Sequence, residues 1–177
     1  MQPDPLAAHD ASSPVPSGGD PLMRQLRAGE ALALQTFYNA LSVEAKRLFR
    51  PAGWTMSPEV AKAICGEQRE AGKRYDLVLE SGSRIVGWAF ATRLDTPEAH
   101  LGIGVARDFT SRGFGRRLMH GLVAHARGRG LRGIKLSHVV GNARAHRLYE
   151  ACGFATTGTH TGSDGLEYVD MRLTLEA

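Results

Sequence analysis

Residues 103–118, IGVARDFTSRGFGRRL, carry the chain from a strand into a helix through a glycine-rich turn. The β-prone run Ala99–Val105 precedes the turn Ser111–Gly115, and an amphipathic pattern continues from Phe114 to Arg129. The glycines let backbone N–H groups of the turn come close to a ligand, because glycine has no Cβ. Together with the positive end of the helix, these N–H groups predict an anion site suited to a diphosphate.

A cluster of basic side chains surrounds and follows this turn, and no acidic residue interrupts it. The whole chain carries a formal net charge of +4, with a sequence pI near 9.4. Such a cluster suits phosphate groups or a nucleic acid, whereas the interpretation without a ligand is a solvated basic helix face. Its members are Arg112, Arg116, Arg117, Arg127, Arg129, Arg132 and Lys135.

Two widespread phosphate-binding motifs do not fit the turn. A Walker A loop requires Gly-Lys-Ser or Gly-Lys-Thr, which the chain lacks. A dinucleotide fingerprint starting at Gly102 and Gly104 would place its third glycine at Arg107. A tight turn without a ligand remains the alternative for Gly113-Phe-Gly115 taken alone.

A second motif, GNARAHRLYEACGF at Gly141–Phe154, follows the next predicted strand. With both motifs in this order, the region from Ala99 to about Gly158 resembles the GNAT (Gcn5-related N-acetyltransferase) superfamily. The resemblance implies an α/β (α+β) fold with a central mixed, mostly antiparallel, strongly twisted sheet of about six or seven strands, flanked by about four helices. It also implies acetyl-CoA as the co-substrate and no metal.

Carried over by position, the resemblance assigns the cofactor to named residues. Asn142 would bond the pantetheine or nearby backbone, and Tyr149 would lie near the sulfur. Thr110 stands where the family usually has Arg or Gln at the start of the turn motif, which puts the affinity for CoA in question. The pantetheine is expected on Ile103, Gly104 and Val105, and the pyrophosphate on Ser111, Arg112, Gly113, Phe114, Gly115 and Arg116.

Acyl transfer to an amine calls for a proton donor and a proton acceptor. Tyr149 is the predicted acid, because a phenol with a pKa of about 10 can keep its proton until the thiolate forms. The alternative is a tyrosine that packs its ring into the core. Some relatives carry a Glu base on the strand five residues before the motif's Asn, where this chain has Ser137.

Other residues are therefore considered for the base. Glu98 and His100 share one face of an alternating strand and are predicted to act together. His138 is a further candidate. His146, with Arg144 and Arg147, is assigned to an exposed helix face. The alternatives are that these are surface polar groups, or that water carries the proton away.

The rest of the chain indicates one domain at 22–177 behind a disordered tail at 1–21, rich in Pro, Ser, Gly, Ala and Asp. The predicted order is β, α, α, β, β, β, α, β, α, β, β, with helices at Ala31–Leu41 and, with Ser57 as its cap, from Ser57 to about Ala71. The turn Ser81–Ser83 is predicted to join two strands as a hairpin. At 42% hydrophobic and 23% charged residues, without a membrane-length apolar run or a secretory signal, the composition favours a cytoplasmic protein.

The predicted function is transfer of the acetyl group of acetyl-CoA to a primary amine within a ternary complex. The amine belongs to a small molecule or to a protein lysine or N-terminus, and would enter beside the two N-terminal helices. No nucleic-acid or membrane partner is expected, and the protein is expected to be a monomer or homodimer. The alternatives are a catalytically silent CoA-binding module and a basic nucleic-acid-binding protein.

Overall fold

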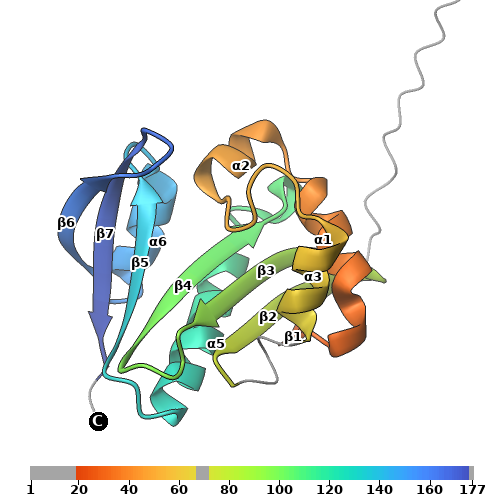
Figure 1. Ribbon diagram of the computed structural model, residues 1–177, viewed down its shortest axis with the longest axis horizontal. Helices are drawn as coiled ribbons and strands as arrows, with labels where there is room; N and C mark the ends of the chain where they lie inside the picture. Colours follow the sequence, from red (N-terminus) through yellow and green to blue (C-terminus); the bar gives the residue numbers. More distant parts are fainter. Residues whose placement is uncertain (1–18, 67–71, 176–177) are drawn as a thin grey trace, which may run out of the picture.

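A seven-stranded sheet forms the centre of the computed structural model, which describes residues 19–66 and 72–175 (Figure 1). The strand order is β1-β2-β3-β4-β5-β7-β6, and every neighbouring pair is antiparallel except β4 and β5. The mixed, mostly antiparallel sheet implied by the resemblance is therefore confirmed. The strands are β1 Leu22–Gln25, β2 Arg74–Ser81, β3 Arg84–Thr92, β4 Glu98–Val105, β5 Gly133–Val139, β6 Ala155–Thr161 and β7 Glu167–Thr174.

The helices lie on both faces of the sheet. In Figure 1, α1 and α3 cross one face of β2 and β3, and α5 lies behind the opposite face. Two short 3₁₀ helices, η1 (Ala28–Glu30) and η2 (Arg107–Phe109), precede α1 and the glycine-rich turn. The described residues contain five α-helices: α1 Ala31–Asn39, α2 Val43–Leu48, α3 Pro58–Cys65, α5 Phe114–Gly128 and α6 Ala143–Ala151.

The N-terminal helices differ from the sequence-based expectation. The helix predicted at Ala31–Leu41 ends at Asn39, and α2 follows as a separate helix that the sequence did not predict. Ser42 caps α2 by accepting a hydrogen bond from the N–H of Ala45, at 3.2 Å. The helix α3 ends at Cys65, and residues 67–71, to which it was expected to extend, lie outside the described residues. Residues 1–18 of the predicted tail lie outside them too.

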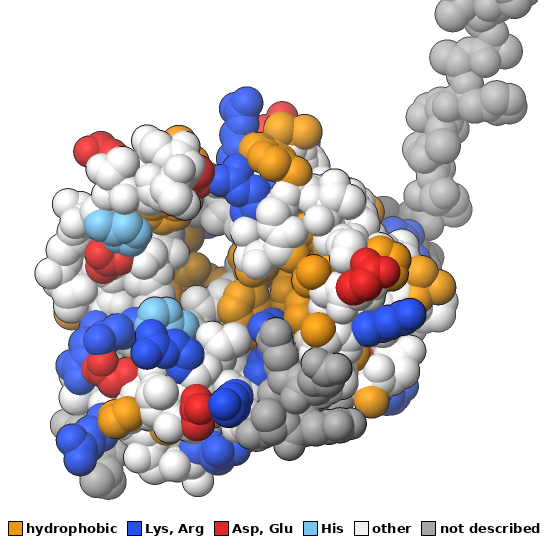
Figure 2. All heavy atoms as spheres, in the orientation of Figure 1, with side chains coloured by type: hydrophobic (Ala, Val, Ile, Leu, Met, Phe, Trp, Pro, Cys, Tyr) orange, Lys and Arg blue, Asp and Glu red, His pale blue; other side chains and the backbone are white. Residues whose placement is uncertain are grey.

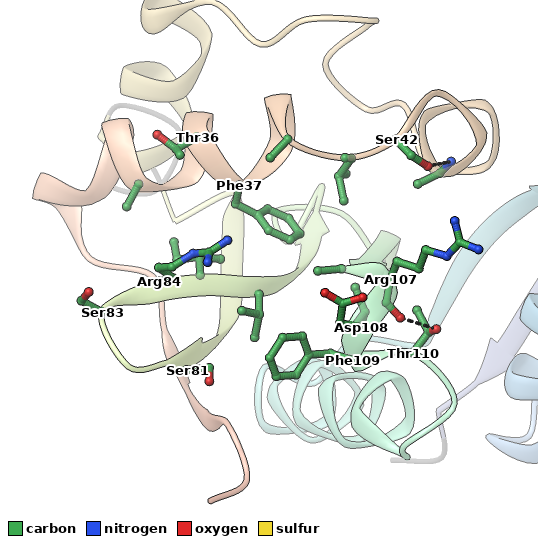
Figure 3. A pocket seen from close by; sticks show the side chains of 18 of the residues that line it. Thr36, Phe37, Ser42, Ser81, Ser83, Arg84, Arg107, Asp108, Phe109 and Thr110 are labelled. Carbon is green, nitrogen blue, oxygen red and sulfur yellow. Dashed lines mark hydrogen bonds between the residues drawn. The ribbon is translucent and has the colours of Figure 1, made fainter. Parts of the chain in front are cut away.

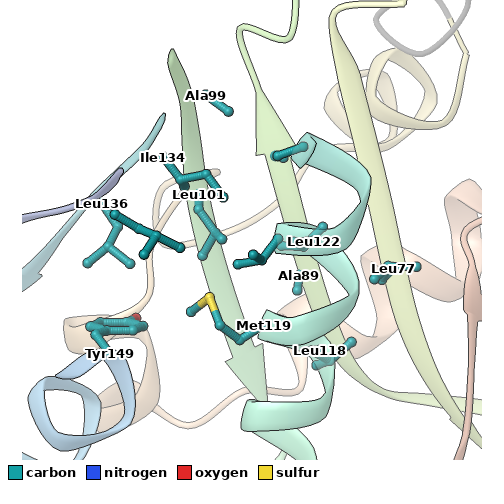
Figure 4. Close-up of a cluster of buried hydrophobic side chains, with 14 of the residues drawn as sticks. Leu77, Ala89, Ala99, Leu101, Leu118, Met119, Leu122, Ile134, Leu136 and Tyr149 are labelled. Atoms are coloured by element: carbon teal, nitrogen blue, oxygen red, sulfur yellow. The ribbon is translucent and has the colours of Figure 1, made fainter. Parts of the chain in front are cut away.

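Two hydrophobic clusters fix the helices to the sheet, one on each face. On β4, Ala99 and Leu101 belong to the cluster under α5, where Leu118, Met119 and Leu122 are also buried (Figure 4). Fully burying a side chain of this size stabilises the fold by about 1.5–3 kcal/mol. The alternation of β4 therefore directs Gly102 and Gly104 to the opposite face, where the aromatic rings of the second cluster lie.

The sheet opens between its two parallel strands. Pairing of β4 with β5 is confined to Glu98–His100 against Gly133–Lys135. Beyond this point β4 continues beside β3 to Val105, while β5 continues beside β7 to Val139. The backbone groups of β4 that face β5 after His100 are therefore available to a ligand that enters the gap.

Among the described residues, no helix is both long enough and apolar enough to cross a membrane.

Candidate active site

A cavity of about 330 Å³ lies between the end of β4 that β5 leaves unpaired, the glycine-rich turn, the α2 segment and α6. It brings together most of the residues that the sequence assigned to the cofactor. Those that line it are Ile103, Gly104, Val105, Ser111, Gly113, Gly115, Arg116 and Asn142, together with Tyr149.

The turn before α5 has the backbone of an anion-binding loop. Ser111 and Gly113 adopt positive φ angles of 60° and 82°, a conformation that glycine tolerates best. Helix α5 starts at Phe114 without a side-chain cap, and its first intrahelical bond runs from the N–H of Arg117 to the carbonyl of Gly113, at 3.1 Å. The N–H groups of the first turn are thus left to bind an anion at the positive end of a 15-residue helix.

The three arginines near the turn take different directions. Arg116 lines the cavity, whereas the guanidinium carbon of Arg112 lies 5.2 Å from the ring centroid of Phe114. Arg117 donates a hydrogen bond to the carbonyl of Pro21, at 3.1 Å, and so ties α5 to the segment before β1. Neither Arg112 nor the buried Phe114 lines the cavity. Arg144 of α6 does line it, and the sequence had assigned that residue to an exposed helix face.

The first position of the turn motif, Thr110, has a local structural role. Its hydroxyl donates to the carbonyl of Arg107 at 2.8 Å, which closes η2. A threonine can make this bond within the turn, whereas the longer side chain usual in the family would extend further.

Asn142 and Tyr149 stand at the two ends of α6. The side-chain oxygen of Asn142 accepts from the N–H of Ala145 at 3.2 Å and caps the helix. Tyr149 is 7% exposed, and burial raises its pKa to about 12. Figure 4 shows Tyr149 beside Leu136 of β5, with its hydroxyl on the side of β4. The phenol therefore stays protonated near neutral pH and can donate a hydrogen bond into the cavity.

A histidine pair supports Tyr149 from β5 and α6. The ring centroids of His138 and Tyr149 are 5.9 Å apart, and Nε2 of His138 lies 2.9 Å from Nδ1 of His146. His146 also lies 3.3 Å from a carboxylate oxygen of Glu150. The assignment of His146 to an exposed helix face is therefore wrong, because its ring packs against β5.

Glu98 and His100 lie where β4 still pairs with β5, and neither lines the cavity. Glu98 forms ion pairs with Lys135 and with Arg172, the latter at 2.6 Å, and these two cations lower its pKa. His100 is exposed, its ring lies 3.4 Å from Nη1 of Arg93, and partial burial and that cation lower its pKa. The structure thus does not bring these two residues together with Tyr149. No cluster that could hold a metal ion occurs in residues 19–66 and 72–175.

Aromatic rings cover the opposite face of β4. The ring of Phe90 occupies the space where Gly102 would carry a side chain, and the ring of Phe49 does so at Gly104. Arg50 then reaches from the loop after α2 to Asp164 in the turn between β6 and β7, at 2.5 Å. Figure 2 shows this face hollowed between the lobe of β5–β7 and the lobe of α1–α3. A second molecule can approach the gap from this side.

A larger cavity, of about 980 Å³, lies between α1, α2 and the β2–β3 turn (Figure 3). It does not include the turn glycines, Asn142 or Tyr149. The residues that line both cavities are Leu41, Ala45, Leu48, Val105, Phe109, Thr110 and Arg144. The smaller cavity is therefore the candidate active site, because it combines the anion-binding turn, the open edge of β4 and a protonated phenol.

Comparisons with known proteins agree with this architecture. The model of the acetyltransferase (GNAT) family matches residues 35–154, and the chain belongs to that family. No curated protein sequence matches the chain significantly.

Many solved structures share the fold. An acetyltransferase of the GNAT family from Streptococcus pneumoniae has a TM-score of 0.76 and 20% identity, covering 88% of this chain and 99% of that one. A ribosomal-protein-alanine N-acetyltransferase from Brucella melitensis has a TM-score of 0.72 and 22% identity, covering 87% of this chain and 99% of that one. Spermidine N-acetyltransferase from Vibrio cholerae, in complex with CoA and spermine, has a TM-score of 0.72 and 18% identity, covering 86% of this chain and 94% of that one. At these identities the likeness concerns the fold.

Proposed function

We propose that this acetyltransferase moves the acetyl group of acetyl-CoA directly to a primary amine, with both substrates bound at once. The observation that carries the proposal is the single cavity that joins the turn Ser111–Gly115, the open edge of β4 and Tyr149. A diphosphate, a pantetheine arm and a thioester sulfur need these three features in this order along one ligand. The solved structure of the Vibrio cholerae enzyme with CoA supports the same choice of cofactor.

The cofactor would be held mostly by backbone groups. The first-turn N–H groups of α5 and the side chain of Arg116 would neutralise the diphosphate. The pantetheine amides would pair with the edge of β4 at Ile103–Val105, which β5 leaves open. A backbone N–H on the same edge would stabilise the oxyanion that forms when the amine attacks the thioester carbonyl.

Tyr149 would act on the leaving sulfur. A free thiol has a pKa of about 8.5, well below the value of about 12 for this buried phenol. Full proton transfer from Tyr149 to the thiolate is therefore uphill. We infer that the phenol stabilises the departing thiolate chiefly as a hydrogen-bond donor, and that the proton on the sulfur is finally supplied by solvent.

Acetyl-CoA turnover, followed by release of the CoA thiol, tests the function. The amines would be spermidine, spermine, a peptide with N-terminal alanine and a peptide with one lysine and a blocked N-terminus. The two polyamines and the alanine peptide represent the acceptor types named for similar folds, and the last peptide tests a lysine side chain. We expect turnover on at least one amine, and a loss of at least about tenfold in kcat for Tyr149→Phe, because it removes a group that acts on the leaving sulfur.

The matched control is Tyr75→Phe. The ring of Tyr75 stacks on that of His125, with centroids 3.6 Å apart, and Tyr75 does not line the cavity. Losing its hydroxyl should therefore leave turnover unchanged. Stabilisation by CoA without turnover on any amine would favour the silent CoA-binding module instead. Stabilisation by oligonucleotides alone would favour the nucleic-acid-binding alternative.

A further inference from the structure

Three polar side chains form a hydrogen-bonded chain across β5, β7 and β6. The hydroxyl of Ser137 donates to Oδ1 of Asp170 at 2.6 Å, and Nδ1 of His160 lies 2.9 Å from Oδ2 of the same carboxylate. Ser137 and Asp170 are direct partners in the ladder between β5 and β7. The ring of His160 stacks on Tyr168, with centroids 5.3 Å apart, so its position is fixed as well. None of these residues was assigned a role from the sequence.

This hydrogen-bonded group lies at the same height along β5 as Tyr149, but on the opposite face of the sheet. Ser137 and His138 are consecutive residues of β5, so their side chains point to opposite faces. His138 packs against the Tyr149 ring, while Ser137 bonds to Asp170. The last residue of β5 paired with β4 is Lys135, two positions earlier and on the same face as Ser137. Ser137 therefore stands where the gap opens, facing the side from which the amine would approach.

Two carboxylates on this face differ in their partners. Glu98 is neutralised by Lys135 and Arg172, and Arg172 also donates to Thr174 at 2.8 Å. Within the described part of the chain, Asp170 has no lysine or arginine partner and is bonded to a hydroxyl and an imidazole. Both of these groups can pass a proton. Of the two acids, Asp170 is the one that can change its protonation state without leaving two cations unpaired.

We propose that Ser137 and Asp170 remove the proton from the acceptor nitrogen, and that His160 holds Asp170 in position. The inference rests on the proposed function. In this step the N–H bond of the attacking nitrogen breaks and its proton goes to Oγ of Ser137, while the hydroxyl proton of Ser137 goes to Oδ1 of Asp170. The C–S bond breaks, and the electron pair leaves on the sulfur beside Tyr149. Asp170 then returns its proton to solvent on the open face.

The relative acidities fix when this step occurs. An alkylammonium of the lysine type has a pKa of about 10.4 and an aspartic acid one of about 3.9, so the carboxylate does not deprotonate a free ammonium to a useful extent. Burial raises the pKa of Asp170, but the hydrogen bonds with Ser137 and His160 together outweigh it and hold this pKa below its ordinary value. The amine therefore attacks in its neutral form. Its nitrogen becomes a much stronger acid once it is bonded to the carbonyl carbon, and the proton leaves at that stage.

The test is the pH dependence of kcat for wild type, Asp170→Asn and Ser137→Ala, on the amine that wild type acetylates fastest. We expect kcat at pH 7 to fall about a hundredfold for Asp170→Asn and at least about tenfold for Ser137→Ala. In Asp170→Asn, kcat should then rise steeply toward pH 9, because hydroxide must replace the lost base. Wild type should show only the shallower rise that follows the fraction of neutral amine, a rise that both enzymes share. A merely structural role would lower kcat equally at every pH.

Thr157→Val is the matched control. Its hydroxyl donates to the backbone carbonyl of Asp170 at 3.3 Å, so the variant removes a hydrogen bond to the same residue without touching the carboxylate. It should keep wild-type kcat, and all variants should keep the stabilisation of Tm by acetyl-CoA. If kcat of Asp170→Asn and Ser137→Ala stays within threefold of wild type, or follows a pH profile parallel to it, this inference is wrong while the proposed function stands. A wild type that acetylates no amine would overturn the proposed function and this inference with it.

Discussion

Replacing Gly102 by alanine measures how tightly β4 is held against the rings of Phe49 and Phe90, which lie on the face of the sheet opposite α5. A Cβ built at Gly102 lies 2.8 Å from Cε1 and 3.0 Å from Cε2 of Phe90, and it meets Cζ still more closely. Non-bonded carbon atoms prefer about 3.5–4.0 Å, so the ring or the strand must move. The Phe90 ring has little room to move. Its centroid lies 5.0 Å from the ring centroid of Trp88 and 4.5 Å from the guanidinium carbon of Arg74.

The size of the effect follows from two opposing contributions. Forcing extra atoms into a packed site costs about 1–3 kcal/mol, and the lower entropy of the unfolded alanine chain offsets about 0.4–1 kcal/mol of it. We therefore expect the free energy of unfolding to fall by about 1–2 kcal/mol and Tm by roughly 2–8 °C. Because Phe90 lies on the face from which we propose that the amine approaches, KM for the amine should rise, while the Kd of acetyl-CoA should change little.

Urea unfolding followed by circular dichroism is the assay, and two other glycines provide controls. At Gly87 the new Cβ meets Cδ1 of the buried Leu79 at 2.8 Å and its Cβ and Cγ at 3.3 Å, a milder overlap than at Gly102, so Gly87→Ala should cost less. At Gly128, at the end of α5, no described heavy atom lies within 4 Å, and alanine should stabilise the helix by up to about 1 kcal/mol. Equal stability of the Gly102 and Gly87 variants would refute the argument from the rigid ring.

Two further predictions concern the cofactor turn and the acid stability. Gly113→Ala adds a methyl group into open space but holds alanine at a φ of 82°, a strain of about 1–3 kcal/mol. The free turn can relax to relieve this strain, whereas acetyl-CoA needs the turn in its present conformation. Acetyl-CoA should therefore bind roughly 5- to 150-fold more weakly by calorimetry, and unchanged affinity would contradict the assignment of the turn. Lys135 and then Arg172 lower the pKa of Glu98 below its ordinary value of 4.5, so its stabilising contribution is complete above that value and is lost as pH falls through the lowered one. Thermal unfolding at stepped pH should show wild type losing stability more steeply than Glu98→Gln below about pH 5, and parallel curves would contradict this.

The features predicted correctly from the sequence are those whose causes lie in consecutive residues. Gly113 makes the left-handed turn before α5, and Ser57 caps α3 by accepting a hydrogen bond from the N–H of Val60, three positions ahead. The turn Ser81–Ser83 joins β2 and β3, as the hairpin chemistry indicated. In each case the residue type and its spacing contain the whole physical reason, so no knowledge of the tertiary structure was required.

The features that the sequence missed depend on contacts between distant segments. Helix α2 has six residues, too few for a hydrophobic period to stand out. The directions of Arg112 and Arg117 depend on Phe114 and on Pro21, and Pro21 is 96 residues away from its partner. A run of arginines beside a phosphate turn therefore predicts positive charge, but it does not predict which guanidinium reaches the ligand.

The register between β5 and β7 explains why the proposed base could not be found from the sequence. Ser137 alone cannot act as a base, and only the pairing of β5 with β7 places Asp170 against it. The same face carries Glu98, which has a similar exposure but opposite surroundings. Two cations hold Glu98 ionised where β4, β5 and β7 are still joined, so protonating it would leave both of them unpaired. Asp170 lies beside the opening with partners that exchange protons. On this face, partners rather than residue type separate a carboxylate that anchors strands from one that can carry a proton.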